Sequence, residues 1–249
     1  MKKIPAKDNK KKLELIKEIV TYFDIKIFKN HIDASLSVHS SLSSYTINPI
    51  IVKYLSKVLK NNYSPEGVAQ ALYYPRVLGT SINTSFGYHI QKMLVELKMA
   101  KGSDTKGMDI QFRDKLDNRK KYCQLKAGPN TINAEDVQPL INKIKGSIAL
   151  GRTNHTMKGI SNNDFIVGVI YGEQQDLSMH YKLIDKSHPV IVGKDFWHRV
   201  SGYPDFYEGL VKSLQSCIDR LDTKDLINKG YRDLVKEIKL SKQFKFKKK

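Results

Sequence analysis

Two stretches decide how the centre of this chain folds: Gly107-Met108-Asp109-Ile110-Gln111-Phe112 and Tyr122-Cys123-Gln124-Leu125-Lys126-Ala127. Both alternate apolar and polar residues, which is the period of a β-strand with one buried face. Residues 113–121 between them are mostly charged or turn-forming, so the two stretches predict a β-hairpin. The alternation puts three apolar side chains of the first strand on one face: Met108, Ile110 and Phe112.

Three polar side chains of this hairpin are expected to converge on one point. Asp109 faces away from the apolar residues of its strand, while Gln124 and Lys126 share one face of the neighbouring strand. Hydrolysis of a phosphodiester needs a divalent cation, which neutralises charge on the phosphate and makes hydroxide available near neutral pH. Hard cations such as Mg²⁺ prefer oxygen ligands, and a lysine beside them can hold a phosphate or orient a water molecule. The hairpin therefore carries the residue types of a metal-dependent phosphodiesterase.

The charge of the whole chain favours a polyanionic partner. The 249 residues include 43 Lys and Arg against 25 Asp and Glu, a formal net charge of +18. Charge of this size raises the encounter rate with polyanions, and nucleic acid is the leading partner class. A proteome rich in Lys and Asn would produce the same charge without any such partner, so charge alone does not decide between the two explanations.

Other features bound the environment of the protein. No long apolar run and no strong basic amphipathic helix supports a membrane partner. Cys123 and Cys217 are the only cysteines, too few for a disulfide framework, and no cluster suggests zinc. The N-terminal lysines are not followed by the apolar segment of a signal peptide. We therefore expect a cytoplasmic protein without membrane association.

The first third of the chain has the pattern of a helical region. We expect helices over about 10–30, 49–59 and 64–74, and a Ser-rich loop over 34–45. Pro49 suits the first turn of its helix, and Pro75 is expected to end the third helix. A polar loop at 79–85 follows, with Ser85 as the N-cap of a helix over 86–98.

The rest of the chain alternates strands and helices. A nearly continuous apolar run at 165–171 predicts a strand buried on both faces. We further expect strands at 180–185 and 189–192 and helices at 134–150, 206–221 and 225–240. This order predicts an α/β sandwich with a mixed central sheet. We expect an N-terminal helical region over 1–78, packed on a core that spans 79–249 and includes the C-terminal helices.

At Asp109 and Gln124-Leu125-Lys126 the sequence resembles the PD-(D/E)XK nuclease superfamily, whose type II restriction enzymes carry their active site on such a strand pair. Longer strings resemble the restriction endonucleases of the TdeIII and PmeII type: Thr80-Ser81-Ile82-Asn83-Thr84-Ser85-Phe86-Gly87, Gly107-Met108-Asp109-Ile110 and Gln124-Leu125-Lys126-Ala127-Gly128-Pro129-Asn130-Thr131-Ile132-Asn133. The last string is much more specific than the short motif, and the likeness covers about residues 76–140 well. It implies a restriction-endonuclease-like α/β/α sandwich, with Mg²⁺ as cofactor and Asp109, Gln124 and Lys126 as catalytic residues.

Gln124 departs from the superfamily pattern, which usually has Asp or Glu at this position. An amide oxygen can ligate a metal but brings no negative charge. Either Gln124 is a tolerated ligand and Glu96 restores the charge, as a carboxylate of the preceding helix does in some superfamily members, or the site is inactive and the protein only binds DNA. Because Asp109 and Lys126 are both kept, we favour an active nuclease.

Short polar side chains of two segments are suited to hydrogen bonds with phosphates or base edges. They are Asn83, Thr84 and Ser85 before the helix, and Asn130, Thr131 and Asn133 after the hairpin. Helix capping and turn formation are the alternative roles of these residues. Four basic residues are candidate phosphate contacts by position only: Arg76, Arg152, Lys143 and Lys145.

These features together predict a type II restriction endonuclease that uses Mg²⁺ to cut both strands of a short site in double-stranded DNA. The resemblance implies a GC-rich, interrupted palindrome such as GGNCC. Symmetric cleavage favours a C2 homodimer, and we expect a cognate DNA methyltransferase as a genetic neighbour rather than a binding partner. Two alternatives stay open: another PD-(D/E)XK DNA nuclease, of repair or junction resolution, and a nuclease-dead DNA-binding protein.

Overall fold

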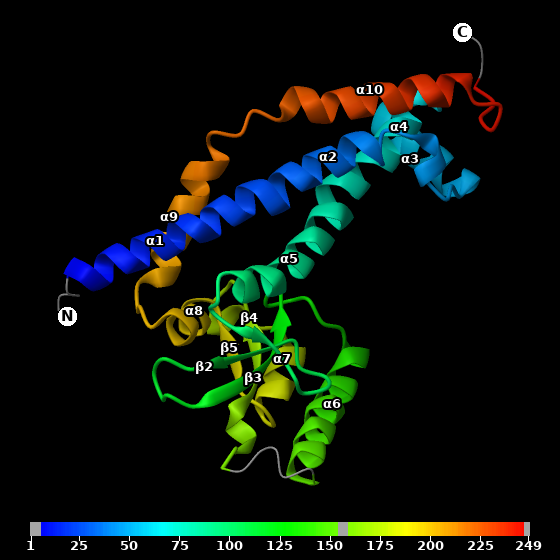
Figure 1. Cartoon of the computed structure of the whole chain (residues 1–249). Coiled ribbons are helices and arrows are strands. Elements are labelled where there is room, and N and C mark those ends of the chain that lie inside the picture. The colour runs from blue at the N-terminus through cyan, green and yellow to red at the C-terminus, as the bar shows by residue number, and fades with distance from the viewer. Residues whose placement is uncertain (1–5, 154–158, 247–249) are drawn as a thin grey trace. The chain divides into compact units, whose positions relative to one another are not determined.

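The computed structural model describes residues 6–153 and 159–246 (Figure 1). The chain divides into two compact units, one made of Met1–Tyr22 and Gly87–Ser216 and the other of Phe23–Phe86 and Cys217–Lys249. This division differs from the break expected after residue 78, because elements distant in sequence pack together. In the first unit, for example, the buried ammonium of Lys12 lies 2.7 Å from a carboxylate oxygen of Asp205.

The described part of the first unit contains one mixed sheet of five strands in chain order. The strands are β1 (Lys101–Gly102), β2 (Ile110–Arg113), β3 (Lys120–Lys126), β4 (Phe165–Val169) and β5 (Val190–Val192). The first three are antiparallel neighbours, and β4 and β5 continue the sheet in parallel with β3. The expected hairpin is confirmed, since Ile110 pairs with Cys123 and Arg113 with Lys120.

Helices cover both faces of this sheet. They include α6 (Ala134–Thr153), α7 (Met179–Asp185) and α8 (Gly193–Ser201). The same unit also contains α1 (Ala6–Tyr22) and most of α5 (Ile82–Glu96) and α9 (Phe206–Ile218). Residues of α6 and α7 share a buried apolar cluster with Tyr122 and Val167 on one face. On the other face α8 lies so close to β4 that a Cβ added to Gly168 would be 2.6 Å from the Phe196 ring. The expected α/β architecture with a mixed sheet is therefore confirmed.

The second unit is helical. Its helices are α2 (Asn30–Ser37), α3 (Pro49–Lys60), α4 (Pro65–Pro75) and α10 (Lys224–Leu240), with π-helical segments at Phe23–Lys29 and Arg76–Ser81. The hydroxyl of Tyr73 in α4 donates to the carbonyl of Ile227 in α10, at 3.0 Å. Gly230 makes this approach feasible, because a Cβ there would lie 2.3 Å from the Tyr73 hydroxyl. The two helices, far apart in sequence, thus form one core.

The prediction of a loop at 79–85 is wrong, because the chain stays helical from α4 through Arg76–Ser81 into α5. Pro75 has φ −61°, which is already a helical value, so its ring removes one N–H donor without forcing the chain out of the helix. Ser85 therefore lies inside α5 and is not its N-cap.

Two further local expectations are wrong. The segment expected as a strand at 180–185 is helix α7, whose buried residues Tyr181 and Ile184 have helical spacing. A short apolar run does not separate the two periods. The Ser-rich segment expected as a loop begins inside α2, where the Ser35 hydroxyl donates to the carbonyl of His31 at 2.7 Å.

Candidate active site

Asp109 is fixed at the point where the chain enters β2. Its backbone N–H donates to the carbonyl of Cys123, and its own carbonyl accepts from the Gln91 side chain of α5, both at 3.0 Å. One carboxylate oxygen accepts from the backbone N–H of Leu125 at 2.8 Å and from the side-chain amide of Gln124. The structure therefore brings Asp109 and Gln124 together, as the strand register requires.

The face of β3 that carries Gln124 also carries Lys126, which is half-buried. Gln124 is only 8% exposed, and its amide oxygen accepts from Nζ of Lys143 in α6 at 3.2 Å. The sequence indicated Lys143 only as a candidate phosphate contact, chosen by position. Its contact depends on which face of the sheet α6 covers, and no pattern within α6 specifies that face.

Met108 does not share a face with Ile110 and Phe112, contrary to the expected alternation. Strand β2 begins only at Ile110, and Met108 lies in the buried cluster with Tyr122 and Ile144. The preceding Gly107 has φ +95°, a conformation that favours glycine. The chain thus turns immediately before Asp109, which ends the alternation.

The electrostatic surroundings of Asp109 combine burial of the carboxylate with two nearby positive charges. Burial raises the pKa of Asp109, and the backbone N–H of Leu125 and the charges of Lys143 and Lys126 only partly oppose this rise. A carboxylate removed from water gains stability from positive charge brought close to it. The site therefore combines a desolvated acid with two lysines.

Two pockets flank this group of residues. A cavity of about 460 Å³ is lined by Lys106, Gly107, Met108, Asp109, Asn142, Lys143, Gly146, Ser147 and Leu150. A smaller one of about 190 Å³ is lined by Gly87, Ile90, Leu125, Lys126, Ala127, Thr131 and Ile170. Both lie against the hairpin, so Asp109 and Lys126 are each accessible to a bound molecule.

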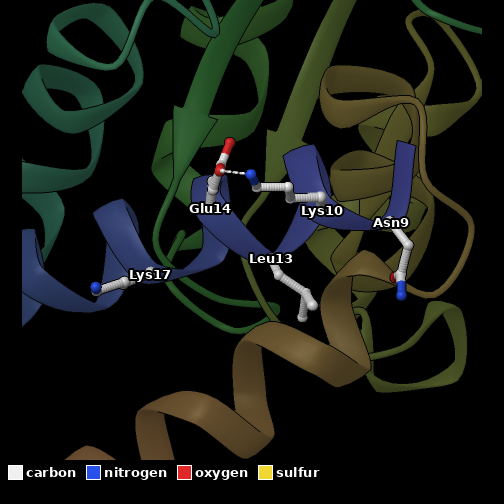
Figure 2. Close-up of a pocket in the computed structure, with 5 residues that line it drawn as sticks. All are labelled: Asn9, Lys10, Leu13, Glu14 and Lys17. Carbon is white, nitrogen blue, oxygen red and sulfur yellow. Dashed lines mark ion pairs between the residues drawn. The ribbon is translucent and has the colours of Figure 1, made fainter. Parts of the chain in front are cut away.

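A pocket along α1 makes a useful contrast (Figure 2). The side chains of Asn9, Lys10, Leu13, Glu14 and Lys17 line it, all from one helix. Its single acid, Glu14, lies 4.0 Å from Lys10, and both side chains are exposed. An exposed acid beside a lysine has neither the desolvation nor the neighbouring ligands of Asp109, so the hairpin is the stronger candidate site.

The chain matches the family model of the type II restriction endonuclease EcoO109I over residues 53–221, which is more than half of its length. It belongs to the EcoO109I restriction endonuclease family. This confirms the expectation of a type II restriction endonuclease, a site-specific deoxyribonuclease that binds DNA. A search of curated proteins gave no match. The nearer likeness to the TdeIII and PmeII type stays a prediction.

Type II restriction endonucleases are generally dependent on divalent metals, and the donors at Asp109 fit a hard cation. The carboxylate of Asp109 is an oxygen donor of this type, whereas the amide oxygen of Gln124 accepts from Lys143 and the amide would have to rotate to offer it to a cation at Asp109. Among the described residues, no group of three or more His, Cys, Asp and Glu is arranged to hold a metal. A site in this family member would thus rest on one carboxylate, an amide and further oxygen donors.

Glu96, the third residue expected to bind the metal in this protein, lies exposed in the last turn of α5. Burial, together with the charge of Glu96, raises the pKa of the Tyr22 hydroxyl. Tyr22 is the last residue of α1, so this interaction joins α5 to α1 and does not involve the hairpin. A role of Glu96 as a metal ligand stays a prediction.

The residues expected to contact DNA fall in both units. Arg76, Asn83, Thr84 and Ser85 belong to the helical unit, and Asn130, Thr131 and Asn133 to the sheet-bearing unit. Turn chemistry explains part of the second group, since the Thr131 hydroxyl donates to the carbonyl of Gly128 at 2.9 Å. The Asn133 backbone N–H donates to the carboxylate of Asp136 at 2.9 Å, where α6 begins. DNA contact by these side chains stays a prediction.

Among the residues that the structure describes, no helix is both long enough and apolar enough to cross a membrane.

Proposed function

We propose that this restriction endonuclease hydrolyses both strands of a short, specific duplex DNA site in the presence of Mg²⁺, with Asp109, Gln124 and Lys126 as its catalytic residues. The observation that carries the proposal is that the Asp109 carboxylate contacts the amide of Gln124, which shares one face of β3 with Lys126, within the region that matches the family.

In this proposal, Asp109 and Gln124 hold the metal, and Glu96 adds negative charge to the site. A bound Mg²⁺ would neutralise charge on the scissile phosphate and supply hydroxide near neutral pH. Lys126 holds a phosphate oxygen or orients the attacking water. Burial of the group keeps the electrostatic attraction between these side chains and the phosphate stronger than it would be in bulk water.

The wider proposal concerns DNA and assembly. Side chains of both units contact the duplex: Arg76, Asn83, Thr84, Ser85, Asn130, Thr131 and Asn133. The DNA sequence that is recognised is GGNCC-like. Two copies related by a two-fold axis would each cut one strand. Sedimentation of the free protein tests whether it forms this dimer. A neighbouring gene for a cognate DNA methyltransferase would support restriction rather than repair, and the protein would act in the cytoplasm.

The deciding experiment is incubation of the protein with plasmid DNA and Mg²⁺. Discrete fragments support a site-specific endonuclease, and their ends give the recognition sequence. A smear of products would mean an unspecific nuclease. No cutting with a retarded band on a gel would support a protein that binds DNA only.

One observation favours that second candidate. The Gln124 amide has its NH₂ group, and not its oxygen, turned to Asp109. In this orientation the amide donates to the carboxylate and offers no oxygen to a cation beside it. The plasmid experiment separates the two candidates.

A further inference from the structure

Lys143 reaches the Asp109–Gln124 pair along a path that the sequence keeps open. Its stem crosses Gly107, where an added Cβ would lie 3.0 Å from Cγ and 3.1 Å from Cε of Lys143. Because side chains are rarely tolerated at φ +95°, glycine is favoured at this position twice over: for its backbone and for this space. The ammonium of Lys143 then lies 3.2 Å from Oε1 of Gln124.

These two neighbours set the orientation of the Gln124 amide. Its NH₂ group donates to Asp109, and its oxygen accepts from Lys143. An ionised carboxylate only accepts hydrogen bonds and an ammonium only donates them, so this orientation satisfies both partners and the reversed one satisfies neither. Gln124 is 8% exposed, so water is poorly placed to replace a lost partner.

We propose that Lys143 is a positioning residue of this site: it holds the amide oxygen of Gln124 away from Asp109, and so opposes the rotation by which Gln124 would offer this oxygen to a cation. The proposal rests on the proposed function, in which Asp109 and Gln124 hold the metal. It follows that Lys143 lowers the affinity of the site for a divalent cation, both by its hydrogen bond and by its charge.

The test replaces Lys143 and measures metal binding without DNA. Lys143→Met keeps an unbranched stem over Gly107 but removes the charge and all three donors. We expect Mn²⁺ to bind about tenfold tighter, because a hydrogen bond from a charged donor and the repulsion of one positive charge are both lost. Electron paramagnetic resonance of the free Mn²⁺ measures this affinity. The side-chain NH₂ resonances of Gln124 in a ¹⁵N–¹H spectrum should shift as the amide loses its fixed orientation.

Matched variants exclude a general effect of charge or stability. Lys182→Met removes an exposed lysine of α7 and should leave both readouts unchanged. Lys143→Arg keeps charge and donors and should stay near the wild-type affinity. Lys143→Ala is expected to act like Lys143→Met and serves in its place if that variant does not fold. An unchanged or weaker Mn²⁺ affinity in the folded neutral variant, or an equal change in Lys182→Met, would overturn the proposal.

Neither readout requires cleavage, so this test and that of the proposed function fail separately. If the protein cuts no DNA but Mn²⁺ binds more tightly to Lys143→Met, the nuclease proposal fails and the role of Lys143 stands. If plasmid is cut but the Mn²⁺ affinity does not change, Lys143 has no positioning role and the nuclease proposal stands.

Discussion

Lys126 and Gln124 lie two residues apart on β3, and each has a separate proposed task. The side chains share one face because successive residues of a strand point to opposite sides. Burial differs between them, since Gln124 is buried and Lys126 is half-buried. A side chain that holds a phosphate or a water must reach solvent, and a ligand that adjoins Asp109 need not. Substitutions at the two positions should therefore have different consequences.

Lys126→Ala should reduce the rate of plasmid cleavage by at least about 10²-fold, because one positioned charge at the scissile phosphate is lost. Binding of duplex DNA, followed by fluorescence anisotropy, should stay salt-sensitive and largely intact, since many other basic residues remain. Lys182→Ala, on α7, is the matched control. Full cleavage activity in Lys126→Ala would show that the catalytic assignment is wrong.

Gln124→Glu should lower the Mg²⁺ concentration needed for half-maximal cleavage several-fold, because it adds a negative charge beside Asp109. The measurement is a Mg²⁺ titration of the cleavage rate. Two adjacent carboxylates repel each other in the absence of metal, so Mg²⁺ should also raise the melting temperature of this variant more than that of the wild type. An identical Mg²⁺ profile in both proteins would place Gln124 outside the site.

At the scale of elements, the end of the hairpin is tied to the start of β4 by one buried acid. Asp164 is 1% exposed and accepts from Lys121 at 2.9 Å and from Arg119. Burial alone would raise the pKa of Asp164, but the hydrogen bonds from Arg119 and Lys121 outweigh it and hold this pKa well below its usual range. The ionised form is therefore the one that stabilises the fold.

Asp164→Asn should lower the free energy of unfolding at pH 7 by about 2 kcal/mol, because the buried ammonium of Lys121 loses one of its two carboxylate partners and keeps only Asp117, at 2.7 Å. A group with a depressed folded-state pKa stabilises the protein above its unfolded pKa, about 3.9 for Asp, and loses this contribution as pH falls. Wild-type stability should therefore fall between about pH 5 and pH 2, and less steeply in the variant.

Urea unfolding at a series of pH values measures both effects. Asp222→Asn removes an exposed acid and is expected to change stability by less than about 0.5 kcal/mol. Equal pH dependence in wild type and Asp164→Asn would mean that Asp164 does not govern the acid sensitivity of the fold.

For the whole molecule, the net charge of +18 is the property that bears on DNA. Positive charge neutralises phosphates and releases their condensed counterions, so affinity falls steeply with salt. Base contacts add specificity to this background and change the salt dependence little.

We expect the affinity for duplex DNA to drop about 10³-fold or more between 50 and 200 mM salt, as for a protein that contacts at least six phosphates. Fluorescence anisotropy with duplexes that carry or lack the recognition site should give similar slopes but different affinities. An affinity that does not depend on salt would contradict an electrostatic mode of DNA binding.

The sequence by itself determined the hairpin, the buried strand β4 and the meeting of Asp109 with Gln124. Each of these depends on the period-two alternation or on an apolar run within a few residues, and strand pairing then follows from the short turn. Such signals are local, and they are readable because hydrophobic burial has to match the pleat of the strand. The motif around Lys126 was readable for the same reason, since its residues adjoin along the chain.

Only the tertiary structure decided the contact of Lys143 with Gln124, the burial of Asp164 and the two units into which the chain divides. Each depends on which face one element presents to another that is distant in sequence, and no local period encodes that choice. The helical course through Pro75 belongs here too, because the fixed φ of a proline is compatible both with ending a helix and with continuing it. Packing between distant elements thus fixed the surroundings of the proposed catalytic residues, which the hairpin had already brought together.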